Sequence, residues 1–575
     1  TLYGELSTPR RVMLHRQIGN ALEAFYGSNV DPHLSELAHH FYQAAPGGDV
    51  AKAIDYATRA GARAVEQLAY EEAAVYYELA LQALDLTDAG DERQRYDLLM
   101  ALGRAYYRSD LPEKAMATLE QAAQFAEQLR EPELLGEAAV AYQLAVNRGP
   151  LAFSPVAAPV LERALEASGS EPTSLRARLL ASLCDAFGGP NMDVAQVERR
   201  LAIAREAKTV AELAGDGIAR VYALRALHEA MQGPEAVEER LAISRELIEV
   251  AEGSGSRTDV VWAHLFLIGD LAQLGEMDEV KKEIAFTCDL ADQMREPSFS
   301  GWRPLWDAML LMREGRYDEA ERRVIEVGPI AQRTQHPGWI GTFSAQFYAI
   351  RWAQGRLSEL EPIVLQRLKE IPGLHVWQAA LMILYLDSDR LDQAREWFDR
   401  LAAEDFADIP KDQQWIVTLT LAANAAYRLG DAGRAAMIYE ILKPYARRQV
   451  TVGFAFICQG SASLQLGEAA AAMGHWEDAE RHFQEALSFN ERTRSLPWIA
   501  ATEFAYADML RQRGEPGNRE RAVSLVNQAL ATFEELGMAK YVERALAIKM
   551  ALQGVSSTDF KTSIDAVAAS VQSER

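Results

Sequence analysis

The residue types that most often carry chemistry are few and scattered in this chain. Its cysteines stand at Cys184, Cys288 and Cys458, too far apart in sequence to indicate a disulfide framework or a cluster of thiolate metal ligands. No Gly-Lys-Ser or Gly-Lys-Thr segment indicates a phosphate-binding loop, and no Gly-x-Ser-x-Gly segment indicates a hydrolase nucleophile. We therefore predict no catalytic residue, no cofactor and no enzyme activity in this chain.

One dense group of histidines comprises His33, His39 and His40, close to Glu36. On a helix, His33 and Glu36 lie one turn apart and His40 follows one turn later, so a metal ion is geometrically conceivable. An open helix surface would leave such an ion unshielded. We interpret the group as structural and predict no metal site.

The elements that must position any site are helices joined by regularly spaced turns. Apolar residues recur at intervals of three and four along nearly the whole chain, which predicts an all-α fold. Turns are predicted at Leu68, Asp110, Gly275, Gly315, Gly355, Asp389, Gly430, Gly474 and Gly514, with three more at Gly149-Pro150, Gly189-Pro190 and Gly233-Pro234. A mean spacing of about 40 residues is typical of helical-hairpin repeats.

Within several units, small and large residues alternate at similar places. Gly61, Gly103 or Gly467 lies midway along the first helix, and Tyr77, Leu119 or Phe483 lies in the second. Small residues let two helix backbones approach closely, and larger residues fill the gaps between them. This spacing predicts tightly packed helix pairs.

The units share a pattern that resembles the tetratricopeptide repeat. It consists of Leu-Gly, an aromatic residue or Ala, then Gly-x-Tyr/Trp-x-x-Ala and a later Phe or Tyr. The resemblance covers roughly residues 49–552 and is strong at Leu68, Asp110, Gly315, Gly430 and Gly474. It implies a right-handed superhelical solenoid of about twelve helical hairpins, with the first helix of each pair lining the concave face. The units are longer than the usual repeat and are similar to variant arrays of bacterial signalling ATPases.

Counting back from the turns places a set of apolar residues on this expected concave groove. Trp262 and Trp302 lie thirteen residues before their turns, and Leu265 and Leu305 lie ten before. The same count places Met309, Met312, Trp352 and Tyr427 on the groove. A stripe of Met, Leu and aromatic residues can bind apolar or peptide ligands adaptably. The alternative is that these residues pack between neighbouring repeats.

A more polar lining is expected in the N-terminal half of the groove. It consists of Arg104, Tyr107, Arg108, Arg176 and Arg220. These residues would attract an anionic ligand, or would pair with acidic neighbours across repeats. The Lys/Asn pattern by which some arrays clamp a peptide carboxylate is absent, because Thr420 rather than Lys lies one turn before Asn424.

The two ends of the chain differ from the array. Residues 1–48 contain a basic helix at 9–25 and a second helix at 32–44. The segments 2–7, 10–11, 14–18, 32–34, 37–41 and 47–49 resemble the junction between the winged helix and the repeat arm of bacterial STAND-type signalling ATPases. Residues 553–575 are expected to form a linker and a short capping helix at 563–571. Because the chain begins with Thr1 rather than Met, we expect a longer parent protein.

Charge and hydropathy limit the partners. The net charge of −24 disfavours binding to nucleic acid, and the longest apolar run, residues 379–386, is too short to span a membrane. We predict a cytoplasmic sensor array that binds a protein, a peptide or a small signalling ligand. The resemblance implies that it controls an ATPase module and a linked nucleotide cyclase or transcription regulator in the same polypeptide. The alternative is a free-standing scaffold that docks peptides or partner proteins.

Overall fold

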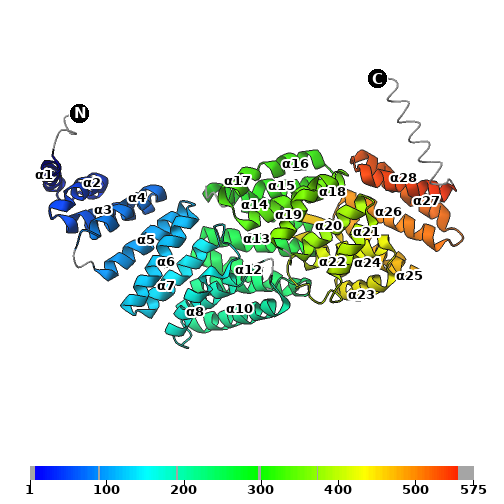
Figure 1. Cartoon of the computed structure of the whole chain (residues 1–575), viewed down its shortest axis with the longest axis horizontal. Helices are drawn as coiled ribbons and strands as arrows, with labels where there is room; N and C mark the ends of the chain where they lie inside the picture. The colour runs from blue at the N-terminus through cyan, green and yellow to red at the C-terminus, as the bar shows by residue number, and fades with distance from the viewer. Residues whose placement is uncertain (1–6, 88–90, 190–191, 295–298, 372, 555–575) are drawn as a thin grey trace, which may run out of the picture. The chain divides into compact units, whose positions relative to one another are not determined.

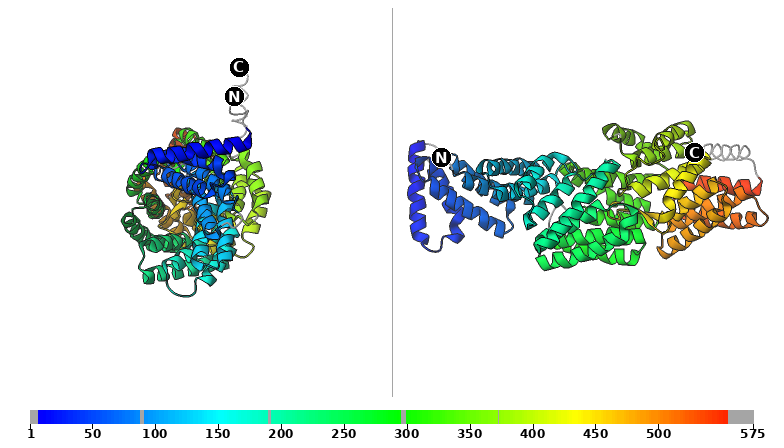
Figure 2. Two further views of the ribbon diagram at one scale, coloured as in Figure 1. Left: turned by 90° about the vertical axis from the view of Figure 1, so that its left-hand side faces the viewer. Right: turned by 90° about the horizontal axis from the view of Figure 1, so that it is seen from below.

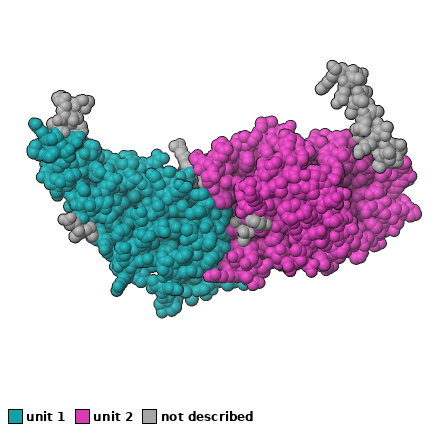
Figure 3. All heavy atoms as spheres, viewed as in Figure 1, with its two compact units in different colours: residues 1–188, 202–226 teal, residues 189–201, 227–575 magenta. Residues whose placement is uncertain are grey.

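The computed structural model describes residues 7–87, 91–189, 192–294, 299–371 and 373–554. The chain divides into two compact units (Figure 3). Unit 1 comprises Thr1–Gly188 and Ala202–Ala226, and unit 2 comprises Gly189–Leu201 and Leu227–Arg575. The expected helix at 563–571 and the segment 2–6 lie outside the described residues.

Unit 1 is built from helices that pack side by side with their neighbours in sequence (Figures 1 and 2). They are α1 (Thr8–Tyr26), α2 (Leu34–Ala44), α3 (Val50–Glu66), α4 (Tyr70–Leu84), α5 (Glu92–Arg108), α6 (Pro112–Leu129), α7 (Pro132–Val146), α8 (Ala158–Ala167) and α9 (Ser174–Ala186). The helices α10 (Val194–Ala214) and α11 (Gly217–Ala230) each contribute residues to both units. The first two helices coincide with those predicted at 9–25 and 32–44.

Unit 2 continues the helical pairs and adds two short strands. Its helices are α12 (Val237–Ser254), α13 (Arg257–Leu274), α14 (Met277–Met294), α15 (Trp302–Arg313), α16 (Tyr317–Ile325), α17 (Gly328–Thr334), α18 (Pro337–Ala353), α19 (Glu361–Glu370), α20 (His375–Asp387), α21 (Leu391–Leu401), α22 (Trp415–Leu429), α23 (Ala432–Leu442), α24 (Ser463–Ala472), α25 (Trp476–Arg492), α26 (Leu496–Arg513), α27 (Asn518–Glu535) and α28 (Ala539–Gln553). The strands are β1 (Gln449–Val452) and β2 (Ile457–Ser461). Among the described residues, no helix is both long and apolar enough to cross a membrane.

The predicted turns explain why the helices end where they do. All nine turns of the first set, at Leu68, Asp110, Gly275, Gly315, Gly355, Asp389, Gly430, Gly474 and Gly514, have a positive φ. This left-handed conformation ends a helix by satisfying its last carbonyl groups. Gly233 differs, with φ −66°, and is followed by a short 3₁₀ turn (Pro234–Ala236). Pro190, in another of the three additional turns, lies outside the described residues.

The small residues lie where two helices approach most closely. A Cβ atom on Gly103 would lie 2.5 Å from Cγ of Leu119, and one on Gly467 would lie 2.7 Å from Cε1 of Phe483. A Cβ on Gly61 would meet the ring of Tyr77 at 2.7 Å. The predicted helix pairing is confirmed, and the fold is an all-α array of helical hairpins.

The antiparallel hairpin of β1 and β2 is a departure from the all-helical expectation. It lies between α23 and α24, and Thr451 pairs with Cys458. The strands have four and five residues, and most of their residues on both faces are buried. Strands this short that are covered on both faces do not show the alternation of apolar and polar residues that identifies a half-buried strand.

Candidate functional site

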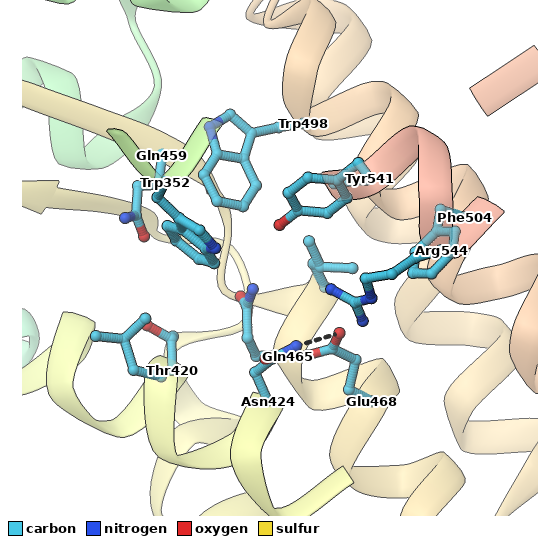
Figure 4. A pocket seen from close by; sticks show the side chains of 13 residues that line it. Trp352, Thr420, Asn424, Gln459, Gln465, Glu468, Trp498, Phe504, Tyr541 and Arg544 are labelled. Atoms are coloured by element: carbon cyan, nitrogen blue, oxygen red, sulfur yellow. Dashed lines mark hydrogen bonds between the residues drawn. The ribbon is translucent and has the colours of Figure 1, made fainter. Parts of the chain in front are cut away.

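The first helices of several pairs in unit 2 converge on a pocket, which we call the inner pocket (Figure 4). Helices α18, α22, α24, α26 and α28 supply its walls, together with β2. Its cavity volume is about 20 Å³, enough for one water-sized group. The lining residues are Trp352, Thr420, Leu421, Asn424, Gln459, Leu464, Gln465, Glu468, Trp498, Ala501, Phe504, Tyr541 and Arg544.

Three polar atoms of the inner pocket are buried without a hydrogen-bond partner among the described residues. Asn424 Nδ2 donates to Glu468 Oε1 at 2.8 Å, which joins α22 to α24. The other carboxylate oxygen, Glu468 Oε2, is left without a partner, as are Asn424 Oδ1 and Trp352 Nε1. Buried polar groups are nearly always paired in folded proteins, so this concentration is characteristic of a site that receives a polar ligand or ordered water.

Burial makes the carboxyl group of Glu468 a weak acid. Loss of hydration raises its pKa to about 7, although the hydrogen bond from Asn424 and the positive charges of Arg544 and Arg428 oppose the shift. The negative charge of Asp508 adds to the shift. A carboxyl with this pKa exists in both its neutral and its ionised form near neutral pH, so a bound cationic group would favour ionisation.

Aromatic rings enclose the polar floor of the inner pocket. The rings of Trp352 and Trp498 lie edge to face, with centroids 6.5 Å apart. Phe504 and Tyr541 form a second such pair at 6.3 Å. The guanidinium carbon of Arg544 lies 5.0 Å from the Phe504 ring centroid, and Figure 4 shows the side chain extending from α28 toward Glu468. Arg544 forms no ion pair with the described residues.

Of the residues predicted for the groove, one lines the inner pocket and another lies beside it. Trp352 lines the inner pocket, half-buried. Tyr427 lies one turn beyond Asn424 on α22, where its hydroxyl donates to Asp508 and accepts from Gln512 Nε2 at 2.7 Å. Burial raises the pKa of Tyr427 well above its usual value. This hydroxyl therefore stays neutral and links α22 to α26 beside the inner pocket.

The other apolar candidates are covered by the chain itself. Leu265, Leu305 and Met309 are fully buried, Trp302 and Met312 are at most 8% exposed, and Trp262 is partly buried. The β-hairpin lies against the helices that carry these residues. Trp306 Nε1 donates to the carbonyl of Phe454 at 3.0 Å, and Gln346 Nε2 donates to that of Phe456 at 2.6 Å. This placement matches the packing alternative, and ligand binding by these residues stays a prediction.

The polar candidates of unit 1 mostly contact their own neighbours. Arg104 lies 3.9 Å from Glu137, and Arg176 pairs with Glu206 at 3.2 Å and donates to the carbonyl of Gly169. The guanidinium of Arg148 covers the ring of Tyr107 at 4.3 Å, and that of Arg108 lies 5.8 Å from the ring of Tyr70. Arg220 is half-buried. The contacts of Arg104 and Arg176 match the cross-repeat pairing alternative, and anion binding stays a prediction.

The histidine group is used in packing between the first helices. His33 stacks on Tyr26 with ring centroids 3.6 Å apart, and the Tyr26 hydroxyl donates to Glu36 at 2.9 Å. His40 lies 2.9 Å from His15 between their Nδ1 atoms. Burial and the neighbouring histidines lower the pKa of both. Within the described segments, no three His, Cys, Asp or Glu side chains are grouped as metal ligands.

A buried Asp–His pair elsewhere in unit 2 has a structural geometry. Asp270 accepts from Arg240 Nε at 2.8 Å and lies 2.8 Å from His228 Nε2. The hydroxyl of Ser244 donates to the same carboxylate at 2.7 Å rather than to the imidazole. A nucleophile–base pair requires a hydrogen bond from the serine hydroxyl to the histidine ring, which is absent between Ser244 and His228. This arrangement therefore stabilises the packing of α11, α12 and α13.

The sequence reasoning missed Glu468, Trp498 and Arg544. A signal for Glu468 was present, because it lies six residues before its turn at Gly474 and Asn424 lies six before Gly430. Asn424 has Thr420 rather than Lys one turn before it, so the pattern that clamps a peptide carboxylate does not include it. The structure supplies a carboxylate on the next repeat as its partner instead.

Comparisons with known proteins assign no family to this chain. No family model matches the chain, and no curated protein matches it. Among solved structures, the crystal structure of the APC/C hetero-tetramer Cut9-Hcn1 is 17% identical, with 88% of this chain and 94% of that chain covered and a TM-score of 0.42. The structure of Naa15/Naa10 bound to HypK-THB is 12% identical, with 98% of each chain covered and a TM-score of 0.23. A circular tandem repeat protein is 13% identical, with 99% and 100% covered and a TM-score of 0.16.

Proposed function

We propose that this chain is a non-catalytic binding array that acts as the sensor arm of a larger signalling protein. The observation that carries the proposal is the inner pocket, where the first helices of several hairpins bring together Trp352, Asn424 and Glu468, each with an unpartnered buried atom. A ligand seated there contacts several repeats at once. In a repeat array each unit touches its neighbours, so such a ligand favours one relative arrangement of those repeats over another.

The N-terminal helices support a connection to a preceding module. Arg16 on α1 is bonded to Asp49 and to the carbonyl of Gly47, and Lys52 on α3 donates to Asn20 at 3.0 Å. These contacts bind α1 to the start of the array, so a force on α1 reaches the first repeats directly. The sequence resemblance of this region favours a STAND-type ATPase as the module that the array controls, with a nucleotide cyclase or transcription regulator as effector.

The proposal is tested on the complete polypeptide that contains this chain. Deletion of residues 49–552 is expected to make ATP-dependent oligomerisation and effector output constitutive, or to abolish their response to the inducing signal. A deleted protein whose output equals that of the intact protein, with and without the signal, would show that the array is not a sensor. The free-standing scaffold would then be the better account.

A further inference from the structure

We propose that the inner pocket binds a small zwitterion of the amino-acid class, with its ammonium on Glu468 and Asn424 and its carboxylate on Arg544 and Trp352. The inference deepens the proposed function and rests on it, because it names the chemistry of the ligand that the sensor arm would read. It follows from which polar atoms are left unpartnered and from the sign of the charges around them.

The unpartnered atoms include acceptors and donors. Glu468 Oε2 and Asn424 Oδ1 are acceptors without donors, and an ammonium group carries three N–H donors. Trp352 Nε1 is a buried donor without an acceptor, and the Arg544 guanidinium is a cation without an ion pair among the described residues. A carboxylate accepts from both. A ligand with only one of these charges would leave part of the set unsatisfied.

The cavity and walls of the inner pocket suit the ammonium end of such a ligand. The cavity volume of about 20 Å³ takes one water-sized group, which is the size of an ammonium, and Trp498, Ala501 and Phe504 are also among the lining residues. Aromatic faces attract cations and bury apolar side chains, so the rings serve the ammonium and the apolar remainder of the ligand. Charges of both signs surround the floor, since Asp508 and Asp387 lie near Arg428 and Arg544. A zwitterion suits this balance better than a net anion or cation.

Other ligand classes fit less well. A free phosphate would bring negative charge beside the buried carboxyl of Glu468. A peptide amino terminus would supply the ammonium but no carboxylate next to it. A simple amine would leave Trp352 Nε1 without an acceptor and Arg544 without an ion pair.

The test is calorimetric titration of the whole chain with the standard L-amino acids, after a thermal-shift screen has selected those that raise its melting temperature. At least one is expected to bind saturably. Its N-acetyl derivative, which lacks the ammonium, and its amide, which lacks the carboxylate, are each expected to bind at least about tenfold more weakly. Failure of every amino acid to bind, or equal binding of the acetylated or amidated form, would overturn the proposal.

Variants locate the binding. Glu468→Gln and Arg544→Gln are expected to weaken binding at least about tenfold, while Glu440→Gln and Arg519→Gln, at exposed positions on the second helices α23 and α27, leave it unchanged. Trp352→Phe keeps an aromatic wall and removes only the Nε1 donor, so it covers the case in which a charge variant fails to fold. Binding that all three pocket variants leave unchanged would place the ligand elsewhere and refute this site. The calorimetry needs no effector. If no amino acid binds, the deletion experiment on the complete polypeptide still decides the sensor role separately.

Discussion

Replacing Glu468 with Gln should change how the stability of unit 2 depends on pH. The carboxyl has an ordinary pKa near 4.5, and burial raises its pKa to about 7 in the folded chain. Between these values the folded chain keeps a proton that the unfolded chain has released. The free energy of unfolding therefore falls as pH rises from about 4.5 to about 7, and the contribution of the neutral carboxyl is lost above that pH.

The size of the effect follows from the pKa difference. At about 1.4 kcal/mol for each pH unit, the wild-type chain loses at most about 3 kcal/mol that the uncharged glutamine does not lose. Glu468→Gln is therefore expected to gain stability relative to the wild type between about pH 5 and about pH 8. Unpaired buried charge is the physical cause, because the ionised form keeps only one hydrogen bond from Asn424.

Urea unfolding followed by tryptophan fluorescence measures this directly. The signal reports on unit 2 alone, since every tryptophan of the chain lies at or beyond Trp262. Glu440→Gln, with its carboxylate exposed on α23, is the matched control for loss of one acidic group. If the difference in free energy of unfolding between wild type and Glu468→Gln were the same at about pH 5 and at about pH 8, the carboxyl would not be buried as described and the reasoning would be wrong.

Three further outcomes test the packing and the pocket. Gly467→Ala should destabilise unit 2 by about 1–3 kcal/mol, because its Cβ would lie 2.7 Å from the Phe483 ring. Gly341→Ala, at an exposed position on α18, should instead stabilise it by about 0.5–1 kcal/mol. Urea unfolding midpoints that shift in the same direction for both variants would contradict this. Asp270→Asn should lower the free energy of unfolding by about 3–5 kcal/mol, since it leaves Arg240 buried without a counter-charge, whereas Asp278→Asn, at an exposed position, should lower it little. Thermal melts followed by circular dichroism measure the loss. A loss below about 1 kcal/mol for Asp270→Asn would refute the stabilising role of Asp270. The amino acid that binds should bind more tightly at about pH 8 than at about pH 6, because its ammonium pairs with the ionised form of Glu468, and calorimetry that shows the opposite order would contradict the assigned contacts.

Local features of this fold were predictable from the sequence. A turn such as Gly474 and a close approach such as that of Gly467 to Phe483 depend on residues within one hairpin. Their spacing repeats along the chain, so the positions of turns and close approaches in one hairpin predict those in the next. The nine regular turns and the helix pairing were predicted for this reason.

Contacts between distant repeats were not predictable in the same way. Trp306 reaches the carbonyl of Phe454, and Arg313 that of Thr493, across more than a hundred residues each. No pattern within a repeat indicates which distant segment will cover its inner face. The sequence placed Trp302 and Leu305 on the inner side of the array but did not show that the β-hairpin would cover the helix that carries them.

The inner pocket was predictable in part. Counting from the turns identified Trp352 and Tyr427, and the same count leads to Asn424 and Glu468. Trp498 and Arg544 come from α26 and α28, and their convergence with α18 depends on how far the array turns over several repeats. That curvature is the sum of many small packing choices, which single residue types do not encode.

The sensor role is tested most directly by measuring effector output from the complete polypeptide with and without the amino acid that binds. The wild-type protein is expected to change its output when that amino acid is added, and the protein carrying Glu468→Gln, with an intact fold and a weakened site, is expected to show no change at the same concentration. An equal response of both proteins, or no response of the wild type at concentrations that saturate the inner pocket, would contradict the account.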